Sequence, residues 1–309
     1  MSKLKRIGLS IVVATSILVS SVSNVTPEVE AKSVATKVIK QKTKFKLKSV
    51  PKFKKSKPYV TVNGNKPYFT KKMLKAKNFE KYSSLDSRGR CRVVAACIDE
   101  KNMPKSNRGG ISSVKPTGWH TYCYKGVSGG YLYNRCHLIG YQLSAENANR
   151  QNLITGTRYL NINGMLPFEN MVADYIEETG NHVLYRVTPI FKGKELVARG
   201  VLMEARSIED GGEGIEFNVY CYNNQPGIKI NYKTGTSSGK GKIVKSKENS
   251  NKEDTSSKTG TYVYSASSTK FHLKWCRYVS QISKTNYRTA KSRKKLINQG
   301  YEPCKVCSP

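Results

Sequence analysis

A polar run divides this chain into two parts of very different size. The run Thr236–Gly260 is rich in Ser, Lys and Gly and has almost no large apolar side chain, which favours a flexible linker. The part before it is long enough for one sizeable domain. The tail after it, with about 50 residues, has too little core to be secure alone. We therefore expect a main domain, a linker over residues 236–260, and a small module over residues 261–309 that needs a staple.

The tail carries two closely spaced pairs of metal-binding side chains. "FHLKWC" contains His272 and Cys276, and "PCKVC" contains Cys304 and Cys307. Two such pairs, separated by an intervening segment, are typical of tetrahedral structural Zn²⁺ sites. The alternative, in an oxidising compartment, is a disulfide that joins Cys276 to Cys304 or to Cys307. The pattern predicts a module stapled by Zn²⁺ or by a disulfide.

The N-terminus predicts export from the cytoplasm. Basic residues precede an apolar run from Ile7 to about Val19, which is the order of a secretory signal. Cleavage is expected after Ala31 or nearer Ser23. The apolar run approaches the roughly 18 residues that suggest a membrane span, so an uncleaved anchor is the alternative. Residues 1–31 are thus expected to be a signal peptide or an N-terminal anchor, and the protein to be secreted or membrane-anchored outside the cytoplasm.

The charge balance indicates a polyanionic partner. Lys and Arg number 54 against 21 Asp and Glu, which gives a formal net charge of +33 at pH 7. An excess of this size suits nucleic acid, anionic lipid headgroups or acidic wall polymers, although solubility alone is the plainer explanation. Lysines alternate with apolar residues through residues 32–56. We expect this segment to be a poorly ordered basic arm that lies on phosphates or on an anionic cell envelope.

Residues 57–235 have the pattern of an α+β domain. Two β-rich runs flank an Asn-Gly pair within Pro58–Thr70, which predicts a hairpin. Further strand candidates lie on both sides of one helical pattern. That pattern begins near Pro167, a residue suited to a helix start, and ends at Gly180, a residue suited to a helix end. This order favours a largely antiparallel sheet with a helix packed on it.

One histidine stands out in the strand candidate "YLYNRCHLIGYQL". His137 follows Arg135 by two residues, so the two side chains should project from the same face of an extended strand. A base beside a guanidinium suits attack on a phosphodiester, because the base activates water and the cation holds phosphate oxygen. From residue type alone, a packed structural histidine is the competing interpretation.

The longer sequence context resembles a known family. "NRCHLIGYQL" resembles the "DRGH" motif of the DNA/RNA non-specific endonucleases, which have a ββα-metal active site. "NLITGTRYLNINGMLPFENMV" resembles the metal-binding arm of secreted and DNA-entry nucleases of streptococci and their relatives. The likeness covers roughly Lys57–Gly235. The tail is similar to the small Ada-like or zinc-ribbon-like modules at the ends of secreted bacterial nucleases.

The resemblance implies a role for each matching residue. His137 would be the general base, and Arg135 would lie near the scissile phosphate. Asn161 would hold Mg²⁺, with Mn²⁺ as an alternative ion. Two further residues have expected roles in supporting the site and in ordering water around the metal, respectively: Asn152 and Glu169. Apart from the resemblance, Arg158 in "TGTRYL" is a candidate for phosphate contact. The motif differs at two places, since Asn134 replaces its Asp and Cys136 replaces its Gly. The orientation of the histidine ring is therefore expected to be set differently here.

The activity implied is Mg²⁺-dependent cleavage of DNA, with RNA as a further substrate, leaving 5′-phosphate and 3′-hydroxyl ends. A base that must be neutral predicts loss of rate below about pH 6. Two other functions compete: a non-catalytic extracellular protein that binds DNA for uptake, and a structural protein of the envelope. Neither gives a reason for His137, Asn161 and Glu169 together. No obligate protein partner is expected.

Overall fold

The computed structural model describes residues 27–41, 43–243, 259–274 and 276–304. The expected signal segment before residue 27, most of the expected linker and Cys307 lie outside these ranges. Within them, no helix is both long and apolar enough to cross a membrane.

A six-stranded antiparallel sheet forms the centre of the main domain. Its strand order is β1-β9-β8-β7-β3-β2. In that order the strands are β1 (Tyr59–Thr61), β9 (Glu216–Tyr222), β8 (Gly200–Ser207), β7 (Val183–Ile190), β3 (Val94–Ile98) and β2 (Phe79–Tyr82). The expected α+β class with a largely antiparallel sheet is confirmed.

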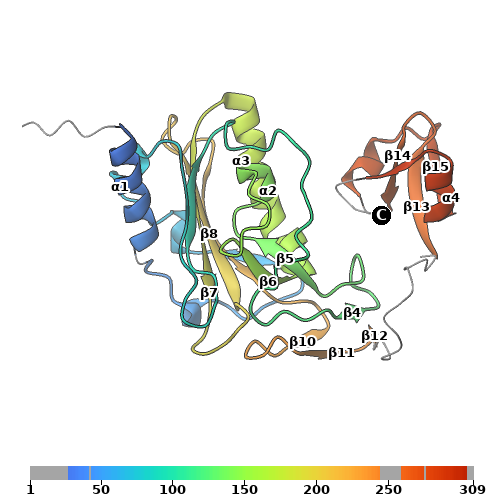
Figure 1. Cartoon of the computed structure of the whole chain (residues 1–309), viewed down its shortest axis with the longest axis horizontal. Helices are drawn as coiled ribbons and strands as arrows, with labels where there is room; N and C mark the ends of the chain where they lie inside the picture. The colour runs from blue at the N-terminus through green and yellow to red at the C-terminus, as the bar shows by residue number, and fades with distance from the viewer. Residues whose placement is uncertain (1–26, 42, 244–258, 275, 305–309) are drawn as a thin grey trace, which may run out of the picture.

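Both faces of this sheet are covered, one by α1 (Pro27–Lys40) and the other by α3 (Leu166–Thr179) (Figure 1). Side chains alternate between the two faces along a strand, and β3 shows this directly. Val94 and Ile98 belong to the core that includes α3, whereas Ala95 and Cys97 belong to the core that includes α1. Burial on both sides explains why the central strands are almost continuously apolar.

The helix α1 corrects the prediction of a poorly ordered arm over residues 32–56. Val34, Ala35 and Val38 are buried against the sheet, because helical spacing brings them to one face. Residues 43–56 also have described positions, and they include a short helix η1 (Leu47–Ser49) before β1. A high lysine content thus did not prevent order, since the apolar residues between the lysines contact the domain.

The predicted hairpin in Pro58–Thr70 is also wrong. The Asn-Gly pair does make a left-handed turn, in η2 (Asn63–Asn65), where all three residues have positive φ. However, β1 pairs with β9 rather than with the residues after the turn. The Asn65 side chain fixes this arrangement by bonding to the backbone of Glu216 and Asn218.

The site-bearing unit is a two-stranded antiparallel sheet followed by a helix. It consists of β5 (Tyr133–His137), β6 (Leu153–Thr157), the π-helical segment η4 (Leu160–Met165) and α3. As expected, Pro167 lies in the first turn of α3, and Gly180 closes it with a left-handed φ of 69°. Val172 and Ile176 pack α3 on the large sheet, which holds the unit in place.

Short elements complete the main domain: η3 (Met73–Lys75), α2 (Tyr141–Ser144), β4 (Cys123–Tyr124), β10 (Ile228–Ile230), β11 (Ser237–Gly239) and β12 (Lys242–Ile243). The last two correct the start of the expected linker. β11 pairs with β10, and β12 pairs with β4, so residues 237–243 still belong to the main domain.

The described part of the C-terminal module is a small sheet with one α-helix and one other short helix. Its strand order is β15-β13-β14-β16, and its core consists of Tyr262, Phe271 and Leu296. The elements are β13 (Thr259–Ser265), β14 (Lys270–Leu273), η5 (Arg277–Gln281), β15 (Tyr287–Ser292), α4 (Arg293–Asn298) and β16 (Glu302–Pro303). So small a core agrees with the expectation that the module needs a staple.

Candidate active site

His137 ends β5 and is almost fully buried, with 7% of its surface exposed. Its Nε2 atom lies 2.7 Å from the backbone carbonyl oxygen of Asn147. A carbonyl oxygen can only accept, so Nε2 is the protonated nitrogen of the neutral ring. The lone pair is therefore on Nδ1, which is the nitrogen that can take a proton from water.

The surroundings of His137 keep it neutral. Burial lowers its pKa to about 4, and the nearby charge of Arg108 contributes to the shift, while the bond to Asn147 opposes it. Burial likewise lowers the pKa of the Arg108 guanidinium. Sequence reasoning missed Arg108, because it lies in a loop well before the motif. An arginine next to two glycines was the one available signal.

Arg135 is committed to the loop that carries Arg108. Its Nη2 donates to the carbonyl oxygen of Ser112 at 2.8 Å, and its Nε donates to that of Val114. The guanidinium also lies 4.1 Å from the centre of the Trp119 ring. The structure therefore gives Arg135 a loop-holding role, in addition to the phosphate contact predicted for it.

Asn152 is fully buried and braces the backbone just after His137. Its Oδ1 accepts from the amide of Ile139 at 2.9 Å, and its Nδ2 donates to the carbonyl oxygen of Ile139 at 2.9 Å. Its own backbone oxygen accepts from the amide of Leu138 at 2.8 Å. Both polar atoms of the Asn152 side chain are engaged by Ile139, so they do not face a ligand. Asn152 therefore positions the end of β5.

Asn134 bonds to two of the residues predicted for the site, Asn161 and Arg158. Its Oδ1 accepts from Asn161 Nδ2 at 3.4 Å and from Arg158 Nη1 at 3.4 Å. Because its amide nitrogen is engaged in this way, Asn161 has its Oδ1 available as a metal ligand. Asn134 therefore orients Asn161 and Arg158 without the carboxylate that the motif has at this position.

Glu169 lies in the first turn of α3 and is buried. Burial raises the pKa of its carboxyl to about 8. The carboxyl group of Glu169 lies close to Gly140, where an added Cβ would meet it at 3.0 Å. A buried carboxyl and an oriented amide oxygen are hard oxygen donors, and they fit a small cation such as Mg²⁺, which needs few protein ligands.

The cysteine beside the base is packed rather than reactive. Cys136 is fully buried, and burial raises its thiol pKa far above the usual value. Its sulfur lies over Gly156 on β6, where an added Cβ would approach within 2.2 Å. A side chain at position 136 is therefore accommodated by the absence of one at position 156.

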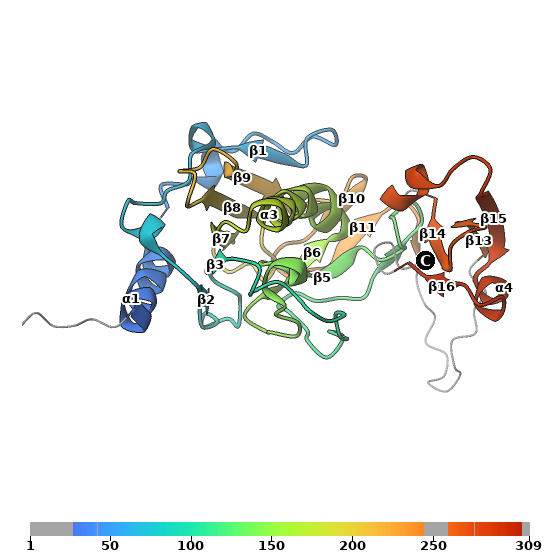
Figure 2. The same ribbon diagram turned by 90° about the horizontal axis from the view of Figure 1, so that it is seen from above.

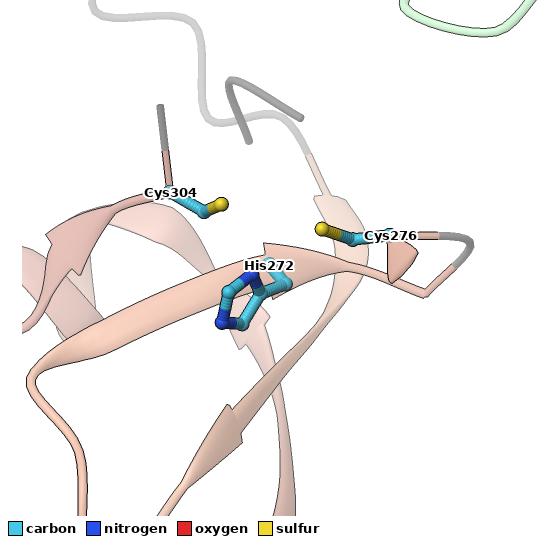
Figure 3. A group of neighbouring side chains, drawn as sticks. All are labelled: His272, Cys276 and Cys304. Carbon is cyan, nitrogen blue, oxygen red and sulfur yellow. The ribbon is translucent and has the colours of Figure 1, made fainter. Parts of the chain in front are cut away.

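A second cluster lies in the C-terminal module. The ligand atoms of His272, Cys276 and Cys304 all lie within 4.8 Å of one another, and Figure 3 shows the three side chains converging. No disulfide joins Cys276 to Cys304. Nδ1 of His272 is buried and has no hydrogen-bond partner among the described residues. One imidazole and two thiols suit Zn²⁺, and the fourth expected ligand, Cys307, lies outside the described residues.

Comparison with known proteins identifies the main domain. Residues 70–209 match the family model of the DNA/RNA non-specific endonucleases. A deoxyribonuclease of Streptococcus dysgalactiae subsp. equisimilis is 34% identical over 110 residues, which is 34% of this chain and 32% of that protein. The match therefore spans about a third of this curated relative.

Two solved structures have a similar fold. NucA from Streptococcus agalactiae with magnesium bound is 26% identical, with a TM-score of 0.52, and the match covers 58% of this chain and 85% of that one. The same protein without metal is 26% identical, with a TM-score of 0.51 and coverage of 58% and 86%. Residues 70–209, which carry His137, Asn161 and Glu169, therefore form a domain of the DNA/RNA non-specific endonuclease family.

Proposed function

We propose that the protein is a secreted, Mg²⁺-dependent endonuclease that hydrolyses DNA with little sequence preference. RNA is a further candidate substrate, and the products carry 5′-phosphate and 3′-hydroxyl ends. The observation that carries the proposal is the state of His137. It is a buried, neutral imidazole whose Nε2 is held by a backbone carbonyl, so that Nδ1 is left as a base. Asn161 and Glu169, an amide and a carboxyl of metal-binding type, follow in η4 and in the first turn of α3, and they support a catalytic role over a packed histidine.

The protein groups divide the work of hydrolysis. Nδ1 of His137 takes a proton from the attacking water, and the Asn147 carbonyl keeps the ring in position as the positive charge develops. Arg108, near His137, and Arg158, bonded to Asn134, are our candidates to hold phosphate oxygens together with Arg135. Asn152 fixes the strand end from which His137 projects.

Asn161 and Glu169 are the residues that would hold Mg²⁺ and order the water around it. When bound, the ion would stabilise the charge on the phosphate and on the departing 3′ oxygen. The comparison structure of NucA with magnesium bound supports this choice of ion. Neutral Asn161 leaves the charge of the cation uncompensated, which favours that stabilisation.

Secretion and a Zn²⁺-stapled module complete the proposal. The N-terminal residues have the order of a signal peptide, and His272, Cys276 and Cys304 converge in the tail. The competing function is a non-catalytic extracellular protein that binds DNA for uptake. It accounts for the net charge of +33 but not for the neutral base.

A plasmid-nicking assay tests the proposal. The wild-type chain should cut supercoiled DNA with Mg²⁺ and stop with EDTA, and His137→Ala should reduce cutting by at least a thousandfold, since both the base and its alignment are lost. His120→Ala is the matched control, because His120 Nε2 also bonds to a backbone carbonyl, that of Thr234, but His120 lies outside the motif. Undiminished cutting by His137→Ala would refute the mechanism. DNA binding without cutting by the wild type would favour the uptake protein.

A further inference from the structure

Seven exposed lysines line the segment that leads into β1. We name residues 44–57 the lysine ridge; its lysines are Lys44, Lys46, Lys48, Lys52, Lys54, Lys55 and Lys57. The chain has no acidic residue from 31 to 79. Within the described residues, no ridge lysine forms an ion pair. Their charge is therefore not neutralised by neighbours.

Aromatic contacts fix the ridge on the main domain. The Phe45 ring stacks on Tyr220 with centroids 5.3 Å apart. The Phe53 ring packs edge-on against Tyr159 at 5.8 Å and Tyr222 at 5.6 Å. Apolar side chains of the ridge thus face the domain, while the lysines between them face solvent.

Hydrogen bonds to the ridge backbone come from the same tyrosines. The hydroxyl of Tyr222 donates to the carbonyl oxygen of Pro51 at 2.7 Å. The hydroxyl of Tyr159 donates to the carbonyl oxygen of Lys55. The backbone is thereby held while the lysine side chains stay exposed, so a ligand that binds them does not have to order the segment first.

The C-terminal end of the ridge lies next to the segment that carries Asn161. Tyr159, which contacts both Phe53 and Lys55, immediately precedes η4, and η4 carries Asn161. Tyr59, the first residue of β1, packs on Phe168, the neighbour of Glu169 in α3, with ring centroids 4.7 Å apart. Figure 2 shows the segment in blue beside β1 and β9. A polyanion bound at the candidate active site would therefore lie near the lysines of the ridge.

We propose that the lysine ridge is a fixed binding surface for the phosphate backbone of a long nucleic acid whose scissile bond lies at His137. This inference rests on the proposed nuclease function. A row of cations that continues from the metal-binding segment suits a linear polyanion, which presents phosphates at regular intervals. An anionic membrane is the less suitable partner. Binding to a membrane would not explain why the ridge is attached to the segment that carries Asn161.

The ridge should act on substrate binding and not on the chemical step. For long DNA its loss should raise KM and leave kcat nearly unchanged. A small phosphodiester such as bis(p-nitrophenyl) phosphate is too short to reach the ridge, so its cleavage should not change. Binding should also become less dependent on salt, because each lost phosphate contact lowers the slope of log K against log salt by about 0.9.

The test compares two variants with the same change in charge. The ridge variant changes Lys46, Lys48, Lys52, Lys54 and Lys55 to Gln. The control variant changes five exposed lysines in or just before β2, which is the opposite edge strand of the sheet: Lys71, Lys72, Lys75, Lys77 and Lys81. Binding of a 40-base-pair duplex is measured by fluorescence anisotropy in EDTA over a series of salt concentrations, which needs no catalysis.

We expect the ridge variant to bind at least tenfold more weakly, with a salt slope smaller by about 3 to 4, and the control variant to lose much less. Phe53→Ala keeps every charge but removes a docking contact, and it should also weaken binding. Equal losses in the two lysine variants would overturn the proposal in favour of a diffuse charge effect. Unchanged DNA binding, with lost binding to phosphatidylglycerol vesicles, would overturn it in favour of a membrane surface. A failure of the nuclease function alone would appear as absent cutting with these binding results intact.

Discussion

At the scale of single residues, the ring of His137 is controlled by burial and by backbone. Burial holds its pKa near 4, well below the ordinary 6.5, so the ring is neutral in the folded protein at pH 7. The unfolded chain binds a proton near pH 6.5 and the folded one only near pH 4. The free energy of unfolding therefore decreases as pH falls from about 6.5 to about 4. The total decrease is about 3 kcal/mol, at roughly 1.4 kcal/mol per pKa unit.

The same shift predicts the pH dependence of cleavage. The acid limb of kcat/KM should lie well below the pH 6 expected for an ordinary imidazole, because the base form persists to lower pH. Arg108→Gln should move this limb to higher pH, since it removes a charge that opposes protonation, and Arg108→Lys should move it less. The measurement is a pH profile at saturating Mg²⁺ on a small phosphodiester. A limb that stays in place in Arg108→Gln would contradict the electrostatic role of Arg108.

Sequence predicted most of the residues of this candidate site but not how they are held. His137, Asn152, Asn161 and Glu169 could be predicted because they occur in one continuous stretch with a recognisable pattern. The Asn147 carbonyl and Arg108 could not be, because a backbone atom has no sequence signature and Arg108 reaches the site by the path of a loop. That path depends on Arg135, whose bonds to Ser112 and Val114 are tertiary contacts.

At the scale of elements, local signals predicted α3 well and α1 not at all. Pro167 and Gly180 act on their own helix, and the structure places both ends where they indicate. The helix α1 depends instead on contacts with strands far along the chain, such as those of Val38 with β3 and β7. It also covers the buried Arg186–Glu204 ion pair, in which Arg186 further donates to the Val38 carbonyl oxygen at 3.0 Å. An arm that contributes to the core cannot be recognised from its charge.

Substitution of Val38 tests whether α1 belongs to the folded domain. Val38 is fully buried, so Val38→Ala should lower the free energy of unfolding by about 1.5–3 kcal/mol, through lost burial and the space left behind. Lys37→Ala, at the exposed neighbouring position, should change it by less than about 0.5 kcal/mol. Urea denaturation followed by tryptophan fluorescence gives both values. Equal effects of the two substitutions would mean that α1 does not pack on the sheet in solution.

At the scale of the whole molecule, two metal sites of different chemistry are proposed in one chain. The main domain offers oxygen donors from Asn161 and Glu169, which suit a hard cation. The C-terminal module offers sulfur and nitrogen donors from His272, Cys276 and Cys304, which suit Zn²⁺. Since the donor types differ, one ion should not displace the other at physiological concentrations.

Metal analysis of the full chain tests this division. The purified protein should contain about one Zn²⁺ per chain, and Cys276→Ser should lose it, because a tetrahedral site with a ligand removed binds far more weakly. Cleavage of a small phosphodiester should remain Mg²⁺-dependent in that variant. Cys123→Ser is the control, since Cys123 is a free cysteine of the main domain. A zinc-free wild type whose tail thiols do not react under native or denaturing conditions would indicate a disulfide instead.

The carbonyl that holds His137 also bears on how this chain can change over time. A side-chain partner is lost in a single substitution, but the oxygen of Asn147 belongs to the peptide unit and remains whatever residue occupies that position. Substitutions at position 147 can therefore change the side chain there without removing the oxygen that orients the proposed base. Tolerance to substitution should therefore be high at position 147, even though its backbone oxygen contacts the proposed base.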